Sequence, residues 1–379
     1  MAQAQEAEAR YNHSVGVRAD VGKIMQTNKF LRSRHMKHYQ GGQIEFAWQT
    51  LGIREWEHAH RLPSFGIGIG TAWLDNSQEV GHPTSVYGFY NGVIARLGRG
   101  HSFHYNIEAG LACGWTPYHE VRHPENIAVG SKVTCRIGLG LQYAYTIANQ
   151  WKIGVGAGFT HYSNGAVRKP NKGINLGSVQ VSAAYMLKKK PLPQVQKPLK
   201  KLKGNEIDVT LGYGFKRFEV DTIKYPEAGG AYKLGARYNS FTLQGQFLHQ
   251  YCHKGKYGIG LSMVYDELPG STIRVEGDDV AVVLGPASKR YSFGVFGAHE
   301  FCIGNLGIVT QMGYYLHQPS GITKKQRKDV SFQRAGLKYT FPIGIHTGVN
   351  IYAHRLTVAD FIEWNVGYSF KLGKRTIKV

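Results

Sequence analysis

The feature that most constrains the fold of this chain is a strict alternation of apolar residues with polar or small ones. Between residues 151 and 163, the odd positions hold Trp, Ile, Val, Ala and Phe before ending in His and Ser, whereas the even positions hold Lys, Gly, Thr and Tyr. The same alternation runs through 178–187 and 362–372. Because successive side chains of a β-strand point to opposite faces, this pattern predicts an all-β protein whose strands have one apolar face.

Strands of this kind belong either to a soluble sandwich, which buries the apolar face, or to a transmembrane barrel, which turns it toward lipid. The predicted strands often exceed ten residues, are separated by short turns and carry aromatic residues near their ends, as in antiparallel transmembrane β-barrels. Glycine is also unusually frequent, with 48 among 379 residues, which weakens helices. We therefore predict an antiparallel transmembrane β-barrel.

The strands are predicted to form two groups. About eight lie between residues 12 and 187, and about eight more between 207 and 372, on either side of a segment rich in lysine and proline that predicts an extended linker. The Phe-Gly-Ile-Gly-Ile run at 65–69 recurs as Tyr-Gly-Ile-Gly-Leu at 257–261, which indicates an internal duplication. We predict two tandem eight-stranded barrels, residues 1–187 and 205–379, joined by the linker 188–204. One barrel of about sixteen strands is the alternative.

The charge of the chain is strongly positive: 46 Lys and Arg residues against 25 acidic ones give a formal net charge of +21. Such a field favours polyanions, either nucleic acid or a phosphorylated membrane surface. We expect no nucleic-acid partner, because the sequence contains no recognisable binding module and no basic helix. The connections predicted to face outward are instead expected to meet lipopolysaccharide phosphates or simply water. Their basic residues are Lys23, Lys29, Arg32, Arg34, Lys37, Arg122, Arg168, Lys169, Lys172, Lys324, Lys325, Arg327 and Lys328.

Two other patterns could carry chemistry. His119-Glu-Val-Arg-His123 has the spacing of a zinc-protease motif, but that motif requires a helix, and Pro117 and Pro124 bracket it here, so we expect no metal site. Cys113 and Cys135 flank the same predicted loop nearly symmetrically. They form either a disulfide, as an oxidising compartment would allow, or two free thiols.

The most informative pair is His161 and Ser163. Two residues apart on one strand, they point the same way with Cα atoms about 6.5 Å apart, so the imidazole can activate the hydroxyl. Both occupy the apolar, lipid-facing side at the outer end of the strand. If the following hairpin closes symmetrically near Arg168, Asn175 lies opposite His161 and can orient its ring. The alternative is that these polar residues only mark the membrane interface.

The stretch Gly158-Phe-Thr-His161-Tyr-Ser163-Asn164-Gly, followed by Arg168-Lys-Pro-Asn171-Lys-Gly173-Ile-Asn175, resembles the active-site hairpin of the PagL family of outer-membrane lipid A 3-O-deacylases. The resemblance implies an eight-stranded barrel in the bacterial outer membrane with a serine-esterase site on its outer wall, acting on the lipid A of lipopolysaccharide. It also implies His161 as the general base, Ser163 as the nucleophile, Asn171 as the oxyanion-hole residue and Asn164 as its structural neighbour. This chemistry needs no metal or cofactor.

The sequence departs from the family pattern at one position, since Asn175 stands where the family has a glutamate. An amide can hold the imidazole tautomer but cannot stabilise imidazolium by charge. Asp20, near the outer end of the first strand, is a candidate substitute acid. We predict a serine esterase that removes an ester-linked acyl chain from lipid A, with Arg168, Lys169 and Lys172 holding its phosphates. The alternative is a non-catalytic barrel that binds lipopolysaccharide or acts as a pore or scaffold.

The second half does not repeat the His-x-Ser pattern. Aligning Gly154 with Gly348 places Arg355 at the position of His161 and Thr357 at that of Ser163. We therefore expect the second unit to be non-catalytic and to bind or orient the lipid, or to be a structural partner.

Overall fold

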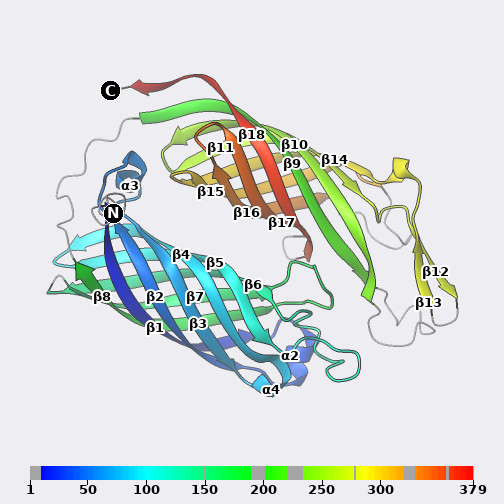
Figure 1. Ribbon diagram of the computed structural model, residues 1–379, viewed down its shortest axis with the longest axis horizontal. Coiled ribbons are helices and arrows are strands. Elements are labelled where there is room, and N and C mark those ends of the chain that lie inside the picture. The colour runs from blue at the N-terminus through cyan, green and yellow to red at the C-terminus, as the bar shows by residue number, and fades with distance from the viewer. Residues whose placement is uncertain are drawn as a thin grey trace, which may run out of the picture. The chain divides into compact units, whose positions relative to one another are not determined.

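A computed structural model describes residues 10–148, 150–188, 201–219, 234–276, 279–319, 329–355 and 358–378. It contains two closed antiparallel barrels, one in the strand order β1 to β8 and one in the order β10-β11-β14-β15-β16-β17-β18-β9 (Figure 1). The prediction of two tandem eight-stranded barrels is therefore confirmed, and the single barrel of about sixteen strands is excluded. Each barrel is described by itself.

The first barrel consists of β1 (Tyr11–Met25), β2 (His38–Thr50), β3 (Ser64–Leu74), β4 (Gly81–Gly98), β5 (His101–Trp115), β6 (Thr134–Ile147), β7 (Trp151–Ser163) and β8 (Ile174–Lys188). Three short helices lie in its connections: α2 (Lys29–Ser33), α3 (Glu55–Ala59) and α4 (Ser77–Val80). No helix in the described ranges is long and apolar enough to cross a bilayer.

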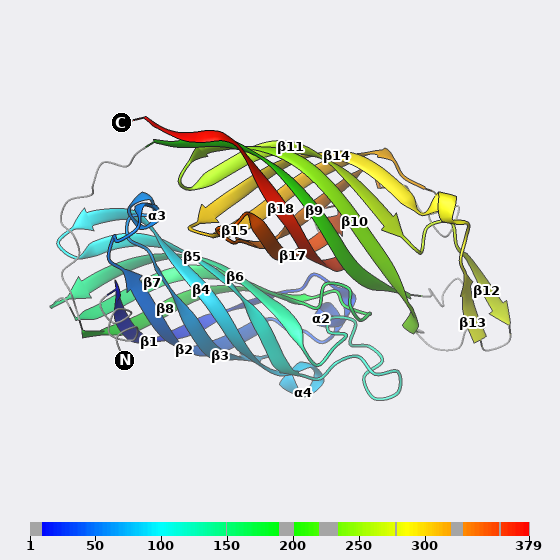
Figure 2. The same ribbon diagram turned by 45° about the horizontal axis from the view of Figure 1, so that its top comes forward.

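The second barrel consists of β9 (Lys201–Glu219), β10 (Leu234–Cys252), β11 (Gly255–Asp266), β14 (Tyr291–Ile303), β15 (Leu306–His317), β16 (Ser331–Thr340), β17 (Ile345–His354) and β18 (Val358–Lys378). The hairpin of β12 (Thr272–Glu276) and β13 (Asp279–Val283) projects from it, followed by the 3₁₀ turn η2 (Ala287–Lys289) (Figure 2). Of the predicted linker, residues 189–200 lie outside the described residues, and β9 already begins at Lys201.

The alternation seen in the sequence separates an apolar outer wall from a polar lumen. On β1, Val17 and Val21 are more than half exposed, whereas Arg18 and Asp20 between them are buried inside the barrel. The Arg18 guanidinium lies 2.7 Å from a carboxylate oxygen of Glu108, and this pairing offsets the cost of burying charge. An apolar outer wall around a polar interior is the arrangement of a membrane-spanning barrel.

The lumen of the second barrel is also filled by paired charges and by stacked rings. Lys256 Nζ lies 2.6 Å from Glu206, and Arg334 Nε lies 3.3 Å from Glu363. The ring of Tyr352 stacks between two others at centroid distances of 4.8 and 5.6 Å. The described side chains therefore plug this lumen, which speaks against a wide water-filled pore.

One end of the first barrel is closed by an apolar cluster. Side chains from α2, α4 and the β5–β6 connection pack there on those from the strand ends, and its members include Phe30, Leu31, Met36, Val80, Trp115, Val129, Tyr162 and Ile174. Asn28 begins α2, with its side-chain oxygen accepting from the backbone N–H of Leu31. This packing fixes the ends of β7 and β8, where the predicted site lies.

The β5–β6 connection contains the His119–His123 motif and is flanked by Cys113 and Cys135. Cys113 and Cys135 are both free thiols, and the register pairs Cys135 with Leu111 rather than with Cys113. His119 and His123 meet in an isolated antiparallel bridge of an irregular loop. Because no helix aligns the two imidazoles, the segment does not have the zinc-protease arrangement.

Candidate active site

The strand β7 carries both His161 and Ser163 on the outer wall of the first barrel. Tyr162 between them points inward, is only 4 % exposed and packs edge-on against Trp115 with the ring centroids 5.2 Å apart. Since neighbouring residues of a strand face opposite ways, the anchored tyrosine directs His161 and Ser163 outward. Both are half-buried.

The imidazole of His161 is held by the neighbouring strand. The β7–β8 register places Asn175 directly opposite His161, and Nδ1 of the imidazole lies 2.6 Å from Oδ1 of the amide. With the amide oxygen as acceptor, Nδ1 carries the proton. The other ring nitrogen, Nε2, is then available to accept a proton, which is the state that a general base requires.

The hydroxyl of Ser163 is engaged by the β7–β8 connection, residues 164–173. Nδ2 of Asn171 donates a hydrogen bond to Ser163 Oγ at 2.8 Å. The side-chain oxygen of Asn171 accepts from the backbone N–H of Asn164 at 3.5 Å. The amide donor of Asn171 is thereby directed at the oxygen that would become the nucleophile.

Gly173 lies next to both His161 and Ser163. Its φ of +73° lies in the left-handed region that favours glycine. A Cβ at this position would lie 3.0 Å from Cε1 of His161 and 3.7 Å from Cβ of Ser163. Both side chains therefore border the same small space, and a side chain at position 173 would crowd the imidazole.

A second loop holds the connection in place. The carbonyl oxygens of Ile127 and Ala128 in the β5–β6 connection accept hydrogen bonds from the backbone N–H groups of Lys172 and Gly173, each at 2.9 Å. Asn126 in turn shapes that connection, because its side chain donates to Thr116 O and accepts from the N–H groups of Ala128 and Val129.

The two loops are joined by another side-chain contact. Nδ2 of Asn164 donates to Oγ of Ser131 at 3.0 Å. Neither Asn126 nor Ser131 was predicted from the sequence, because both belong to a loop without periodicity.

Asp20 is not part of the site, so the prediction that it replaces the family's glutamate is wrong. Its side chain is 3 % exposed inside the lumen, accepts a hydrogen bond from Gln43 at 2.7 Å and lies 3.8 Å from Arg18. The physical reason is strand alternation, since Asp20 shares the inward face of β1 with Arg18. The group beside the imidazole is Asn175.

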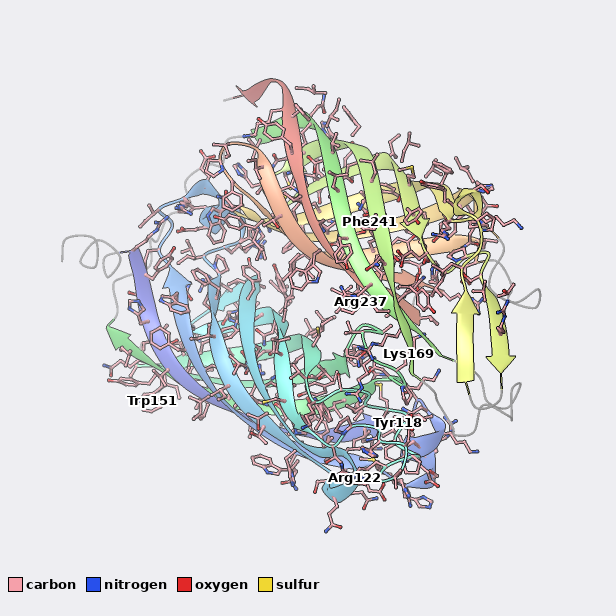
Figure 3. All side chains as sticks on the ribbon, turned by 45° about the vertical axis from the view of Figure 1, so that its right-hand side comes forward. Tyr118, Arg122, Trp151, Lys169, Arg237 and Phe241 are labelled. Carbon is pink, nitrogen blue, oxygen red and sulfur yellow. The ribbon has the colours of Figure 1, made fainter. Side chains whose placement is uncertain are left out.

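The predicted phosphate-binding residues all belong to the β7–β8 connection. Arg168 and Lys172 are exposed and Lys169 is half-buried. Tyr118 and Arg122 lie at the same end of the first barrel as α2 and α4, whereas Trp151 lies at the opposite end (Figure 3). The basic residues at 324–328 of the second half lie outside the described residues.

The corresponding hairpin of the second barrel is built differently. Its connection between β17 and β18 consists of residues 355–357 only, against 164–173 in the first barrel. Arg355 Nε lies 2.6 Å from Asp329, and Thr357 lies outside the described residues. This connection is too short to form a loop like the one that carries Asn171.

Within the described residues, one buried acidic group has the spacing of metal ligands: Glu206, Asp208 and Glu300. Lys256 lies 2.6 Å from Glu206, and Lys338 lies 2.9 Å from Asp208 and also pairs with Glu300. The lysine ammonium groups already neutralise these carboxylates, so the cluster is a set of ion pairs that fills the lumen.

Each half of the chain matches a different family model. Residues 6–184 match the family model "Lipid A 3-O-deacylase (PagL)", and residues 205–372 match "Acyloxyacyl hydrolase, C-terminal domain". No curated protein matches the chain.

Solved structures give weaker likenesses. The outer membrane enzyme PagL is 20 % identical over 44 % of this chain and 97 % of its own, with a TM-score of 0.32. OccK5 (OpdH) of Pseudomonas aeruginosa is 10 % identical over 96 % of this chain and 99 % of its own, with a TM-score of 0.21. Scores this low add nothing to what the two family models establish.

Proposed function

We propose that this chain hydrolyses an ester-linked acyl chain of lipid A, because its first barrel matches the family model of the PagL lipid A 3-O-deacylases and its second barrel matches that of the acyloxyacyl hydrolase C-terminal domain. The reaction takes place on the outer wall of the first barrel, with Ser163 as the nucleophile and His161 as the general base. The bacterial outer membrane supplies the substrate.

The proposed reaction is an acyl transfer to serine followed by hydrolysis. Oγ of Ser163 attacks the ester carbonyl while Nε2 of His161 takes the hydroxyl proton. The tetrahedral intermediate collapses, and the sugar oxygen leaves with the proton returned from His161. Water, deprotonated by the same imidazole, then attacks the acyl-serine and releases the fatty acid.

Charge stabilisation in this scheme comes from the connection 164–173. The Nδ2 donor of Asn171 lies 2.8 Å from Ser163 Oγ, so it can reach the oxyanion, which forms on the carbonyl oxygen two bonds from Oγ. Asn164 acts as a positioning residue, since its backbone N–H orients Asn171 and its side chain binds Ser131. Arg168, Lys169 and Lys172 are proposed to bind the glucosamine phosphates of the substrate.

The single observation that carries the proposal is the outward placement of two hydrogen-bonded pairs, His161 with Asn175 and Ser163 with Asn171. Polar groups on a lipid-facing wall are costly unless they are used. A pair inside the polar lumen of the first barrel would be separated from the acyl chains by the barrel wall, whereas a pair on the outer wall faces them directly.

Mass spectrometry of lipid A tests the proposal. Cells expressing the chain are expected to show lipid A that lacks one ester-linked acyl chain, and cells expressing Ser163→Ala are expected to show fully acylated lipid A. Ser288→Ala, which removes an exposed hydroxyl in η2 of the second barrel, is the matched control and should behave like the parent. Identical acylation in the parent and Ser163→Ala would instead support a non-catalytic barrel.

A further inference from the structure

The outer wall of the second barrel carries an ordered row of aromatic side chains. Tyr213, Phe241, Tyr265 and Tyr291 stand directly opposite one another on β9, β10, β11 and β14. Successive ring centroids are 5.3, 6.2 and 5.2 Å apart. A continuous aromatic row on the lipid-facing side of a barrel marks the level of the membrane interface.

Two arginines extend this row beyond the interface. Arg237 donates to the hydroxyl of Tyr213 at 2.7 Å, and its guanidinium lies 3.7 Å from the ring centroid of Phe215. Arg290 donates to the hydroxyl of Tyr265 at 3.0 Å and to the carbonyl of Gly285. Arg237 and Phe241 can be found on the same side of the second barrel in Figure 3.

Neither guanidinium forms an ion pair in the described part of the chain. The neighbouring carboxylates are engaged elsewhere: Glu267 accepts from Asn239, and Asp266 lies 2.5 Å from Lys216. The arginines are held in place by phenol oxygens, rings and a carbonyl, which do not neutralise them. Their positive charge is therefore available to an anion from outside the chain.

On the other side of the aromatic row, the same wall is hollowed. A groove of about 1320 Å³ runs across β9, β10, β11, β14 and β15. Gly245 and Gly297 form its floor, since a Cβ at either position would meet no atom within 4 Å. Its sides are apolar and outward-facing, with Phe247, Ile259 and Met312 each more than 40 % exposed.

We infer that this wall, defined by Arg237, Arg290, the aromatic row and the groove, binds a phosphorylated glycolipid of the lipid A type without hydrolysing it. The arginines lie at the end of the barrel with the long connections, which in outer-membrane barrels is the outer face. A guanidinium binds phosphate oxygens in a bidentate manner. The groove then accepts acyl chains of the same molecule, so charge and apolar surface match one amphipathic ligand.

Lipid binding to the full chain carrying Ser163→Ala tests this inference separately from hydrolysis. Native mass spectrometry in detergent counts lipid A molecules per chain, and titration gives the affinity. We expect Arg237→Gln with Arg290→Gln to weaken binding at the second barrel about tenfold and to remove its dependence on salt. Filling the groove with Gly245→Leu and Gly297→Leu should lower the number of bound lipids by one.

Matched controls separate this site from general effects of charge and bulk. Lys254→Gln removes a cation from the turn at the opposite end of the same barrel, and Gly88→Leu adds bulk to the outer wall of the first barrel. Both should bind like the parent. Unchanged binding in the arginine and groove variants overturns the inference, as does phosphatidylglycerol binding with equal affinity and equal sensitivity to the arginine changes. Loss of deacylation alone leaves it standing.

Discussion

The seventh and eighth strands form a hairpin in both barrels, and the two hairpins differ where chemistry would occur. In the first barrel, β7 and β8 are joined by residues 164–173, which return Asn171 to within 2.8 Å of Ser163. In the second, β17 and β18 are joined by residues 355–357 alone, and Arg355 pairs with Asp329. Both barrels have the same hairpin, but only the first has a connection long enough to fold back onto outward-facing polar residues of the strand.

The largest effect is expected from removal of the proposed base in the first hairpin. We expect His161→Gln to lower deacylation of lipid A by about 10³-fold, because general base catalysis supplies that much of the rate. The measurement is the rate of fatty-acid release by the purified, folded chain.

The matched change in the second hairpin is His354→Gln. It should leave the rate unchanged, since His354 lies 3.5 Å from Asp360 and belongs to a hairpin without the loop. A substantial residual rate in His161→Gln that disappears when His354→Gln is added would show that the second barrel carries out the hydrolysis.

Strand alternation made most of the fold predictable from the sequence. The eight or so strands predicted between residues 12 and 187 correspond to β1 to β8 of the first barrel. The recurrence of the Gly-Ile-Gly run corresponds to β3 and β11, each the third strand of its barrel in chain order. The β12–β13 hairpin was not anticipated, because a hairpin outside the barrel carries no requirement for one apolar face.

A smaller effect is expected at the glycine that borders both side chains. Gly173→Ala should lower kcat by about 10- to 100-fold, because a Cβ there would press on Cε1 of His161 from 3.0 Å and the φ of +73° is strained for alanine. Displacement of the ring by a fraction of an ångström would move the proposed base relative to Ser163, and proton transfer is sensitive to such shifts.

Gly177→Ala is the matched control on the same strand. A Cβ at Gly177 meets only the end of the Met25 side chain at 3.5 Å, which is ordinary contact. Its activity should equal that of the parent. Equal activity in Gly173→Ala would show that the space beside His161 is not part of the site.

The candidate site was only partly predictable, and the reason differs from residue to residue. The pairing of His161 with Asn175 followed from symmetric closure of the hairpin and agrees with the observed register. The support from Asn126, Ile127 and Ala128 could not be foreseen, because hydrogen bonds between loops distant in sequence leave no local pattern. The prediction of Asp20 is wrong because closeness to the rim does not fix the direction of a side chain, and Asp20 shares the inward face of β1 with Arg18.

The departure from the family at Asn175 gives a sharper test. Asn175→Asp keeps the size of the side chain and places a carboxylate beside Nδ1, where it can stabilise imidazolium by charge. We expect kcat/KM to rise several-fold at neutral pH, and the loss of rate on the acid side of the pH profile to move to higher pH. Asn175→Leu, which cannot accept the hydrogen bond, should be about tenfold slower than the parent. A slower Asn175→Asp at every pH would show that the amide is preferred here.

The smallest effect concerns the aspartates at the end of the third strand of each barrel, Asp75 after β3 and Asp266 as the last residue of β11. Asp75 lies just beyond β3, outside the membrane-spanning segment, and accepts from the backbone N–H groups of His38 at 2.7 Å and Lys37 at 3.0 Å. Partial burial alone would raise its pKa, but these hydrogen bonds and the nearby His38 side chain hold the pKa of Asp75 below its ordinary value. Its counterpart Asp266 faces Lys216 instead.

A lowered pKa in the folded state means that the ionised carboxylate stabilises the fold above its ordinary pKa, and that this contribution is lost as the pH falls through the folded-state value. Asp75→Asn should therefore lower the free energy of unfolding by about 0.5 kcal/mol at pH 7, a small effect because the side chain is 40 % exposed to solvent. The difference from the parent, measured by tryptophan fluorescence during urea unfolding in detergent, should shrink toward zero below about pH 4. A difference that stays constant with pH would mean that Asp75 acts through its shape alone, and the rim of the first barrel would then not depend on ionised Asp75.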